Sequence, residues 1–220
     1  MKIVDLSLPV DSKTIVPPSQ KQPIEFTRVY REPGHWQATW ISMAAHTASH
    51  VDSPLHVIEG GPTIAQIPLE KVVGEAVVLD VTDQGVPDGT IDIDCLAKYD
   101  GQVKEGDIII IRTDWGAKMF GTEEYFTQSP ILTPAAAHWI VKQKPNAVAF
   151  DFFEEYSARL KDFKPDDFEV HQIILGQGII IIEGLTNLKS ITTERFQFFA
   201  APLKLMEAEA APARIFGILP

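Results

Sequence analysis

The pattern of apolar and polar positions predicts a chain built largely of strands. Residues 2–8 alternate apolar with polar side chains, which predicts a half-buried strand. Two alternating segments flank Pro33-Gly34 and predict a β-hairpin. Several other segments are runs of β-branched apolar residues, which are typical of strands buried on both faces. The predicted strands are 2–8, 25–31, 36–45, 75–81, 107–113, 146–150, 178–183, 196–202 and 214–219.

Three segments between these strands have helical patterns. They are residues 92–99, 133–143 and 167–175. Thr133 followed by Pro134 is typical of a helix N-terminus, and either Thr90 or Asp92 is suited to cap the first helix. Strands that alternate with helices predict a mixed α/β fold. The sequence has no repeat and no long linker, so we expect residues 1–220 to form a single domain.

Composition and charge exclude several classes of protein. The 220 residues include 19 Lys and Arg and 30 Asp and Glu, giving a formal net charge of −11 without a basic cluster. Nucleic acids and anionic membranes are therefore not expected partners. No apolar run approaches the length of a membrane span. Asp5 stands where a signal peptide would continue its apolar region, and Cys95 is the only cysteine, so we expect a cytoplasmic protein.

The densest group of potential metal ligands lies in residues 46–56. His46, His50, Asp52 and His56 provide three imidazoles and one carboxylate, which are donors that bind zinc and related divalent metals. A straight strand cannot bring them to one ion, because six extended residues span roughly 20 Å while metal–ligand bonds are about 2 Å.

A straight helix fails as well. It would send Asp52 to the far side from His46 and His50, and Pro54 would break it. We therefore expect a strand end that bends, with the ligands converging at the bend. The small residues 47–49 and the proline suit such a bend.

This segment resembles the signature of the metal-dependent cyclase family of hydrolases, which includes bacterial kynurenine formamidases and isatin hydrolases. The signature reads His-x-Gly-Thr-His-x-Asp-x-Pro-x-His, and this chain keeps the three histidines, the aspartate and the proline. It differs at Ala48, where the family has glycine, and at Ser49, where the family has threonine. Serine keeps the hydroxyl, whereas alanine changes the loop only if the position needs a positive φ. The resemblance implies a swivelling β/β/α domain with a mixed sheet, assembled as a homodimer or homotetramer.

His171 and Glu183 form a second pair of candidate ligands. The predicted helix and strand between them cover about 6 Å and about 16 Å, so the spacing permits a shared site without requiring one. On the residues alone, two solvated side chains are the stronger interpretation. The family has a His and a Glu at this spacing, and Glu183-Gly184-Leu185 matches its Glu-Gly-Leu element. The resemblance implies that His171 and Glu183 complete the metal site, often with a second ion.

These residues indicate hydrolytic chemistry. An ion held by His46, His50 and Asp52 would lower the pKa of a bound water, and the resulting hydroxide would attack an amide carbonyl. A second ion on His171 and Glu183 could share it, with Asp52 bridging, so one or two ions per chain are expected. Nitrogen and oxygen donors fit both zinc and manganese, with zinc favoured.

His56 is the expected catalytic residue. It lies four positions after Asp52, and we expect it to carry a proton from the attacking water to the leaving nitrogen. The alternative is that His56 is a further ligand or a residue that orients a ligand.

The expected activity is hydrolysis of the C–N bond of an aryl formamide, with N-formylkynurenine as the leading substrate, or of a small cyclic amide. Residues 17–20 read Pro-Pro-Ser-Gln where family members often have a Pro-Gly-Asp turn beside the substrate, so another lactam, imide or lactone remains open. The alternative function is a non-catalytic, metal-dependent small-molecule binding or regulatory protein on the same fold.

Other polar residues are weaker candidates. His35 beside a predicted turn and His138 on a predicted helix are expected at the surface. Asp151 ends a buried strand, where sites in open α/β sheets gather, but bulky residues follow it and we assign it no chemistry. Residues 112–115 resemble the family's Arg-Thr-x-Trp element, for which a structural and a substrate-binding role are both open.

Overall fold

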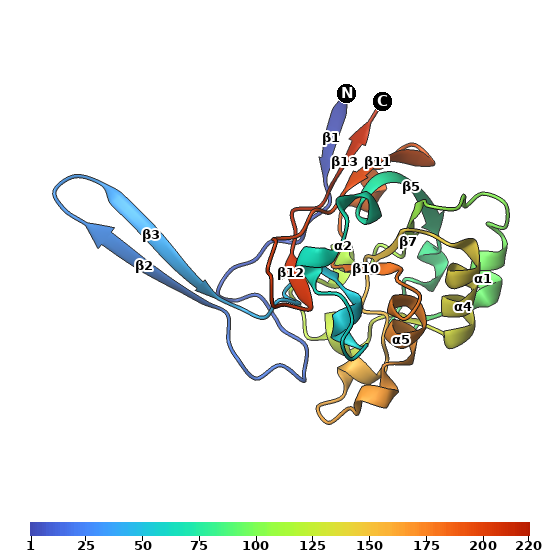
Figure 1. The fold of residues 1–220 in the computed structure, drawn as a ribbon, viewed down its shortest axis with the longest axis horizontal. Helices are drawn as coiled ribbons and strands as arrows, with labels where there is room; N and C mark the ends of the chain where they lie inside the picture. The colour runs from blue at the N-terminus through green and yellow to red at the C-terminus, as the bar shows by residue number, and fades with distance from the viewer.

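A nine-stranded sheet forms the centre of the protein (Figure 1). The computed structural model describes residues 1–220, with the side chain of Ala158 excepted. The strands of the sheet are β1 Lys2–Asp5, β4 His50–Asp52, β5 Val73–Asp80, β7 Ile108–Arg112, β9 Ala147–Phe150, β10 Ile180–Glu183, β11 Arg195–Phe199, β12 Ala210–Pro212 and β13 Phe216–Leu219. Their order across the sheet is β1-β13-β11-β5-β7-β9-β10-β4-β12.

The sheet is parallel in its middle and antiparallel on both sides. Strands β5, β7, β9 and β10 run parallel to one another. Strands β11, β13 and β1 add antiparallel pairs on one side, and β4 and β12 add them on the other. The parallel strands are those with unbroken apolar runs, as expected for strands buried on both faces. The predicted mixed α/β fold is confirmed.

The helices are short. They are α1 Ile93–Ala97, α2 Trp115–Met119, α3 Glu124–Thr127, α4 Pro134–Gln143 and α5 Glu169–Leu175. Helix α4 begins as predicted, because the Thr133 hydroxyl accepts a hydrogen bond from the amide of Ala136. Asp92 caps α1 by accepting from the amide of Ile93, while Thr90 lies in the two-residue strand β6 (Thr90–Ile91), which pairs with β8 (Ile131–Leu132). The elements that were not predicted are too short to show a periodic pattern.

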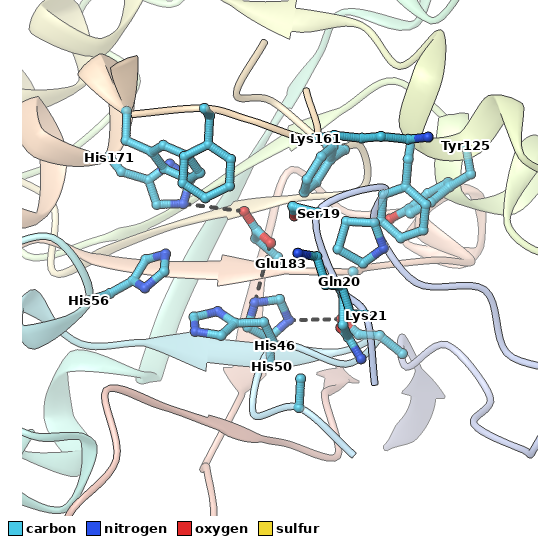
Figure 2. Close-up of a pocket in the computed structure, with 18 of the residues that line it drawn as sticks. Ser19, Gln20, Lys21, His46, His50, His56, Tyr125, Lys161, His171 and Glu183 are labelled. Carbon is cyan, nitrogen blue, oxygen red and sulfur yellow. Dashed lines mark hydrogen bonds and ion pairs between the residues drawn. The ribbon is translucent and has the colours of Figure 1, made fainter. Parts of the chain in front are cut away.

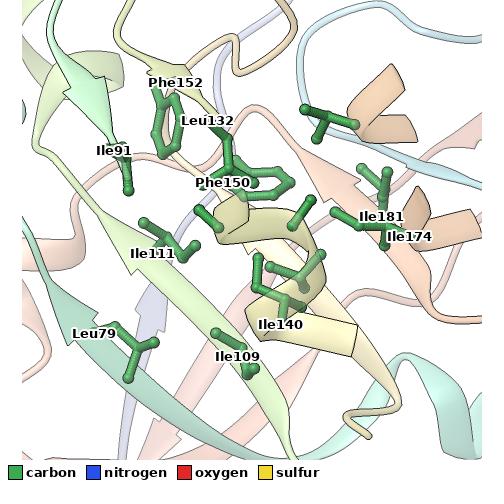
Figure 3. Close-up of a cluster of buried hydrophobic side chains, with 14 of the residues drawn as sticks. Leu79, Ile91, Ile109, Ile111, Leu132, Ile140, Phe150, Phe152, Ile174 and Ile181 are labelled. Carbon is green, nitrogen blue, oxygen red and sulfur yellow. The ribbon is translucent and has the colours of Figure 1, made fainter. Parts of the chain in front are cut away.

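Two apolar clusters pack against the two faces of the sheet. Ile109 of β7 lies in a cluster with Ile140 of α4 and Ile174 of α5 (Figure 3). Its neighbour Ile108 lies in the other cluster, to which all nine strands contribute. A cluster with members from every strand requires the sheet to curl around it. Each fully buried isoleucine stabilises the fold by roughly 1.5–3 kcal/mol.

Strands β2 (Glu25–Arg31) and β3 (Trp36–Ser42) form the predicted hairpin, which projects from the body of the protein (Figure 1). Strand β3 ends three residues before the predicted end at residue 45, and the chain then turns towards β4. The hairpin exposes large apolar side chains, including Trp40 at 74% and Ile41 at 54%.

The first strand is also shorter than predicted. It ends at Asp5 instead of residue 8, because the amide of Leu6 bonds to the carbonyl of Ile215 and Ser7 forms an isolated bridge with Leu185. No helix in the described chain is long and apolar enough to cross a membrane.

Pairing of β4 with β10 joins the two halves of the predicted site. These strands run antiparallel, with His50 opposite Glu183 and Asp52 opposite Ile181. Helix α5, which carries His171, precedes β10 and packs against it. Residues more than 100 positions apart in the chain therefore meet at one end of the sheet.

Candidate metal centre

The segment that carries the histidines bends on both sides of a very short strand. Residues 43–49 form turns between the hairpin and β4, which has only three residues. Pro54 then begins a 3-10 turn that includes His56. The predicted bend is thus present, and it brings His46 and His56 within 4.3 Å of each other, measured between ring centroids.

His46, His50 and Asp52 form one group of potential ligands. The Nδ1 atom of His46 lies 2.9 Å from Oδ1 of Asp52, and the Nε2 atom of His50 lies 3.4 Å from the same oxygen. Two ligands bound about 2 Å from one ion at tetrahedral angles are about 3.3 Å apart. These three atoms are therefore spaced as ligands of a single cation.

Asp52, His171 and Glu183 form a second group. The Nε2 atom of His171 lies 3.9 Å from Oδ2 of Asp52 and 3.5 Å from Oε1 of Glu183. The other oxygen of Glu183 lies 3.2 Å from Nε2 of His50 (Figure 2). Asp52 is shared, and it offers a different oxygen to each group. The predicted second pair does converge on the first.

Each of these three imidazoles is held by an acceptor on the ring nitrogen that faces away from the cluster. The pairs are His46 Nε2 with Glu209 Oε1 at 3.0 Å, His50 Nδ1 with the Ala48 carbonyl at 2.9 Å, and His171 Nδ1 with Glu155 Oε2 at 3.2 Å. An acceptor on one nitrogen places the N–H there, so the other nitrogen presents a lone pair. All three lone pairs point into the cluster.

Buried polar atoms without partners show that the cluster suits a cation. The Nε2 atom of His50 and both carboxylate oxygens of Asp52 are buried and make no hydrogen bond in the described part of the chain. Burying such atoms without a hydrogen bond is costly. A divalent ion would satisfy them, and the donor set of imidazole and carboxylate is one that such ions bind.

The charges of the cluster attract one another strongly. Although burial opposes the charged form, Asp52 raises the pKa of His46 to about 9 and raises the pKa of His50 well above its usual range. Against the same burial, the two histidines hold the pKa of Asp52 well below its usual range. Protons thus neutralise the buried carboxylate when no cation does, and a metal ion would displace them.

His56 lies beside both groups without belonging to either. Its ring centroid is 5.5 Å from that of His171, and it contacts Phe168 edge-on. Burial lowers the pKa of His56 to about 4, so the ring is neutral near pH 7. A neutral imidazole beside the cluster is able to accept a proton.

A cavity of about 630 Å³ lies over the cluster (Figure 2). Its walls are rich in aromatic side chains, namely Phe120, Tyr125, Phe126, Phe153, Phe163 and Phe168. In Figure 2, Lys21 and Lys161 lie on the side of the cavity away from His56 and His171. The cavity therefore joins the ligand groups to an aromatic and partly cationic region.

Three carboxylates of the site were not predicted from the sequence. Glu155 and Glu209 accept from the outer nitrogens of His171 and His46. Glu154 is fully buried, and burial together with the carboxylate of Glu183 raises its pKa well above the usual range. Glu154 and Glu155 follow the predicted strand 146–150, which was a weak signal of a site. Glu209 is 163 positions from His46, and no sequence pattern indicated their contact.

The weaker candidates have structural or surface positions. Asp151 accepts hydrogen bonds from the amide and hydroxyl of Thr113 and from the amide of Asp114, and so holds residues 112–115 in place. His35 and His138 are exposed, as predicted.

The departures at residues 48 and 49 leave the turn intact. Ala48 has a φ of +55°, in the left-handed region where glycine is preferred. The alanine therefore keeps the conformation at a cost of roughly 1–2 kcal/mol. The Ser49 hydroxyl donates to the carbonyl of Gly184 and accepts from the amide of Leu8, both at 2.7 Å.

The fold and the two groups of potential ligands fit a metal-dependent hydrolase, and comparison with known proteins identifies the family. A family model described as a putative cyclase matches residues 4–154, which is more than half of the chain. The chain belongs to this cyclase family.

Individual relatives agree with this assignment. A kynurenine formamidase of Salinibacter ruber is 26% identical over 217 residues, covering 97% of this chain and 96% of that protein. A predicted metal-dependent hydrolase from Bacillus stearothermophilus is 28% identical with a TM-score of 0.77, covering 98% of this chain and 97% of that one. An isatin hydrolase from Labrenzia aggregata shares the fold at 22% identity and a TM-score of 0.81, covering 98% and 93%. These comparisons support an amidohydrolase.

Gly184 offers a test of how the two halves of the site are joined. A Cβ at this position would lie 2.3 Å from the carbonyl oxygen of Ala48, which orients His50, and the residue has a φ of +73°. We expect Gly184→Ala to add overpacking of about 1–3 kcal/mol to the strain of the positive φ.

Gly178→Ala is the matched control, because Gly178 has a φ of +69° with nothing within 4 Å of the added Cβ. It should lower the free energy of unfolding by roughly 1–2 kcal/mol only. Urea denaturation measures both changes. Equal losses in the two variants would show that close contact at Gly184 is not needed.

Proposed function

We propose that this protein hydrolyses the C–N bond of an aryl formamide, similar to N-formylkynurenine, or of a small cyclic amide, through a metal-bound hydroxide. The observation that carries the proposal is the sharing of Asp52 between two groups of inward-facing ligands at the base of an aromatic cavity. The amidohydrolase class of the relatives supports the same reaction.

His46, His50 and Asp52 would hold one divalent ion, and Asp52, His171 and Glu183 would hold a second. Such an ion lowers the pKa of a bound water and polarises the carbonyl of an amide. Zinc is favoured for the first group because imidazoles supply two of its three donors, and manganese also fits.

His56 is the proposed proton carrier. It lines the cavity next to His46 and His171 but is outside both ligand groups. Its neutral ring would accept a proton from the attacking water and return that proton to the leaving nitrogen. The ring of Phe168 packs edge-on against the ring of His56 beside the cavity.

The walls of the cavity favour an aromatic substrate. Six aromatic side chains would bury the aryl ring of a formamide, and such contacts prefer edge-to-face or offset stacking. Lys21 and Lys161, on the side away from His56, would attract an anionic group at the other end of the substrate. We therefore place a carboxylate-bearing aryl formamide ahead of a neutral lactam.

The remaining expectations are part of the same proposal. Residues 1–220 act as one domain, because the β4–β10 pairing and the curled sheet join the first and last segments of the chain. Cys95, the only cysteine, cannot form an intrachain disulfide, which suits a reducing cytoplasm.

The hairpin is the proposed contact in a homodimer. Trp40, Trp36 and Val29 share one face of a two-stranded ribbon and are 74%, 46% and 38% exposed. An isolated two-stranded hairpin is marginally stable in water, so a ribbon of this composition needs a partner surface. A second copy can supply the same apolar strip across a two-fold axis. Residues 25–42 contain two arginines and two glutamates, so this ribbon avoids the repulsion that a net charge of −11 imposes elsewhere.

Replacing Asp52 tests the metal and the reaction together. Asp52→Ala removes the ligand common to both groups, so we expect stoichiometric zinc or manganese in the wild type and none in the variant. Elemental analysis after purification without chelator measures this, and turnover of N-formylkynurenine should disappear with the metal. Asp94→Ala, an exposed acid on α1, is the control and should retain both.

Two results would contradict the proposal in different ways. A wild-type protein that binds no metal after reconstitution with zinc or manganese would remove the metal centre. Bound metal without hydrolysis of any formamide, lactam, imide or lactone would favour the non-catalytic binding protein.

Replacing His56 tests the proton carrier. We expect His56→Ala to lower kcat by about 10²–10⁴-fold, because proton transfer would lose its positioned acid–base group. Its metal content should not change, since His56 belongs to neither ligand group. His138→Ala, on the exposed face of α4, is the control. Unchanged turnover in the His56 variant would rule out the role, and loss of metal would make His56 a ligand.

Replacing Trp40 tests the homodimer. We expect wild-type protein to be dimeric by light scattering coupled to gel filtration, and Trp40→Ser to be monomeric at micromolar concentration, because the shared apolar strip would lose its most exposed residue. Val86→Ser changes an exposed apolar residue away from the hairpin and should leave the dimer unchanged. A monomeric wild type would exclude the dimer, and a tetramer that Trp40→Ser does not dissociate would place the interface elsewhere.

A further inference from the structure

Glu154 is a buried carboxylate that the folded chain does not use. Its side chain is 0% exposed, and neither of its oxygens has a hydrogen-bond partner in the described part of the protein. A buried carboxyl group without a hydrogen bond is costly, and burial together with the carboxylate of Glu183 raises the pKa of Glu154 well above its usual range. Hydrogen bonds within the protein therefore do not explain why Glu154 is buried.

The neighbouring buried acids differ in this respect. Glu155 accepts from the amides of Val170 and His171 and from the ring of His171. Asp151 accepts from Thr113 and from the amide of Asp114. Both acids stabilise the structure through these contacts. Glu154 lies between them in the chain and makes none.

Glu154 lies beside the second ligand group. Its Oε1 atom lies 3.8 Å from Nε2 of His171, the nitrogen that faces the cluster. That nitrogen is also 3.5 Å from Glu183 and 3.9 Å from Asp52. Oxygens of three carboxylates thus lie near one imidazole nitrogen, each slightly farther away than the separation of about 3.3 Å expected of donors bound to a single ion.

We propose that Glu154 is an additional ligand of the second ion, alongside Asp52, His171 and Glu183. This inference rests on the proposed metal centre. It gives the two ion positions different sets of donor atoms. The second position would have three carboxylates and one imidazole, whereas the first has two imidazoles and one carboxylate. Carboxylate oxygens suit harder cations such as Mn²⁺, and imidazole suits zinc. The second position therefore binds Mn²⁺ in preference, and the first binds zinc.

Glu154→Gln tests the proposal by binding alone. It keeps the shape of the side chain and removes the charge. We expect Mn²⁺ affinity, measured by electron paramagnetic resonance of free Mn²⁺ on zinc-loaded protein, to fall at least tenfold, while one zinc per chain remains by elemental analysis.

Glu209→Gln is the matched control, because Glu209 contacts His46 in the first group. Loss of such an orienting acceptor typically costs 10–100-fold in metal affinity. We expect Glu209→Gln to weaken zinc binding and to leave Mn²⁺ binding within a few-fold of wild type. The two variants should thus affect different ions.

Thermal unfolding adds a readout that separates ligation from a purely structural role. Metal-free Glu154→Gln should melt close to the wild-type temperature, because the raised pKa of Glu154 keeps its carboxyl group neutral without a cation, as an amide is, and the rise in Tm that Mn²⁺ produces should be smaller. If the glutamine variant does not fold, Glu154→Asp keeps the charge on a shorter side chain and should weaken Mn²⁺ while retaining zinc.

Two outcomes would overturn the assignment. Wild-type Mn²⁺ affinity in a folded Glu154 variant would show that Glu154 is not a ligand, and loss of zinc alone would place it at the first position. A failure of the metal centre itself is distinguishable, because wild-type protein would then bind neither ion.

Discussion

The burial of the Asp52 carboxylate is the constraint on which the rest of the structure depends. This group is completely inaccessible to solvent, and its two oxygens face two different histidine-containing groups. A buried carboxylate is tolerated only when opposite charge surrounds it. The fold answers this requirement by bringing His46, His50 and His171 to it from two distant parts of the chain.

The surrounding strands hold those imidazoles in place. Strand β4 is only three residues long and would be unstable alone, but it lies between β10 and β12. Its pairing with β10 aligns His50 with Glu183, and the tight contact of Gly184 with Ala48 fixes the carbonyl that orients the His50 ring. Rigid outer contacts of this kind determine which nitrogen faces an ion.

The part of the site within residues 46–56 could be predicted from the sequence, whereas contacts between distant residues could not. The spacing of residues 46–56 excluded a straight strand and a straight helix, so a bend could be predicted from chain geometry alone. His171 and Glu183 could be joined to the site only through the first cluster and the family resemblance, because their residue types and spacing alone favoured two solvated side chains. Glu209 orients His46 across 163 positions, and no local pattern encodes such a contact. Strand β12 and the two-residue strands β6 and β8 escaped prediction because pairing with neighbours, and not their own periodicity, defines them.

The cavity has two ends with different chemistry, and this sets the direction of a substrate under the proposed function. His56 and His171 lie at one end, where a reacting amide must be for its nitrogen to receive a proton. Lys21 and Lys161 lie on the side of the cavity away from His56 and His171, and Asp162, next to Lys161 in the chain, also lines the cavity. A substrate that carries its formamide and its charge on opposite sides of an aryl ring can occupy both ends at once. A small neutral lactam could contact only the first end and would forgo the attraction of the lysines. Binding energy gained far from the reacting bond positions that bond, so the distance between the two ends is itself a means of selecting the substrate.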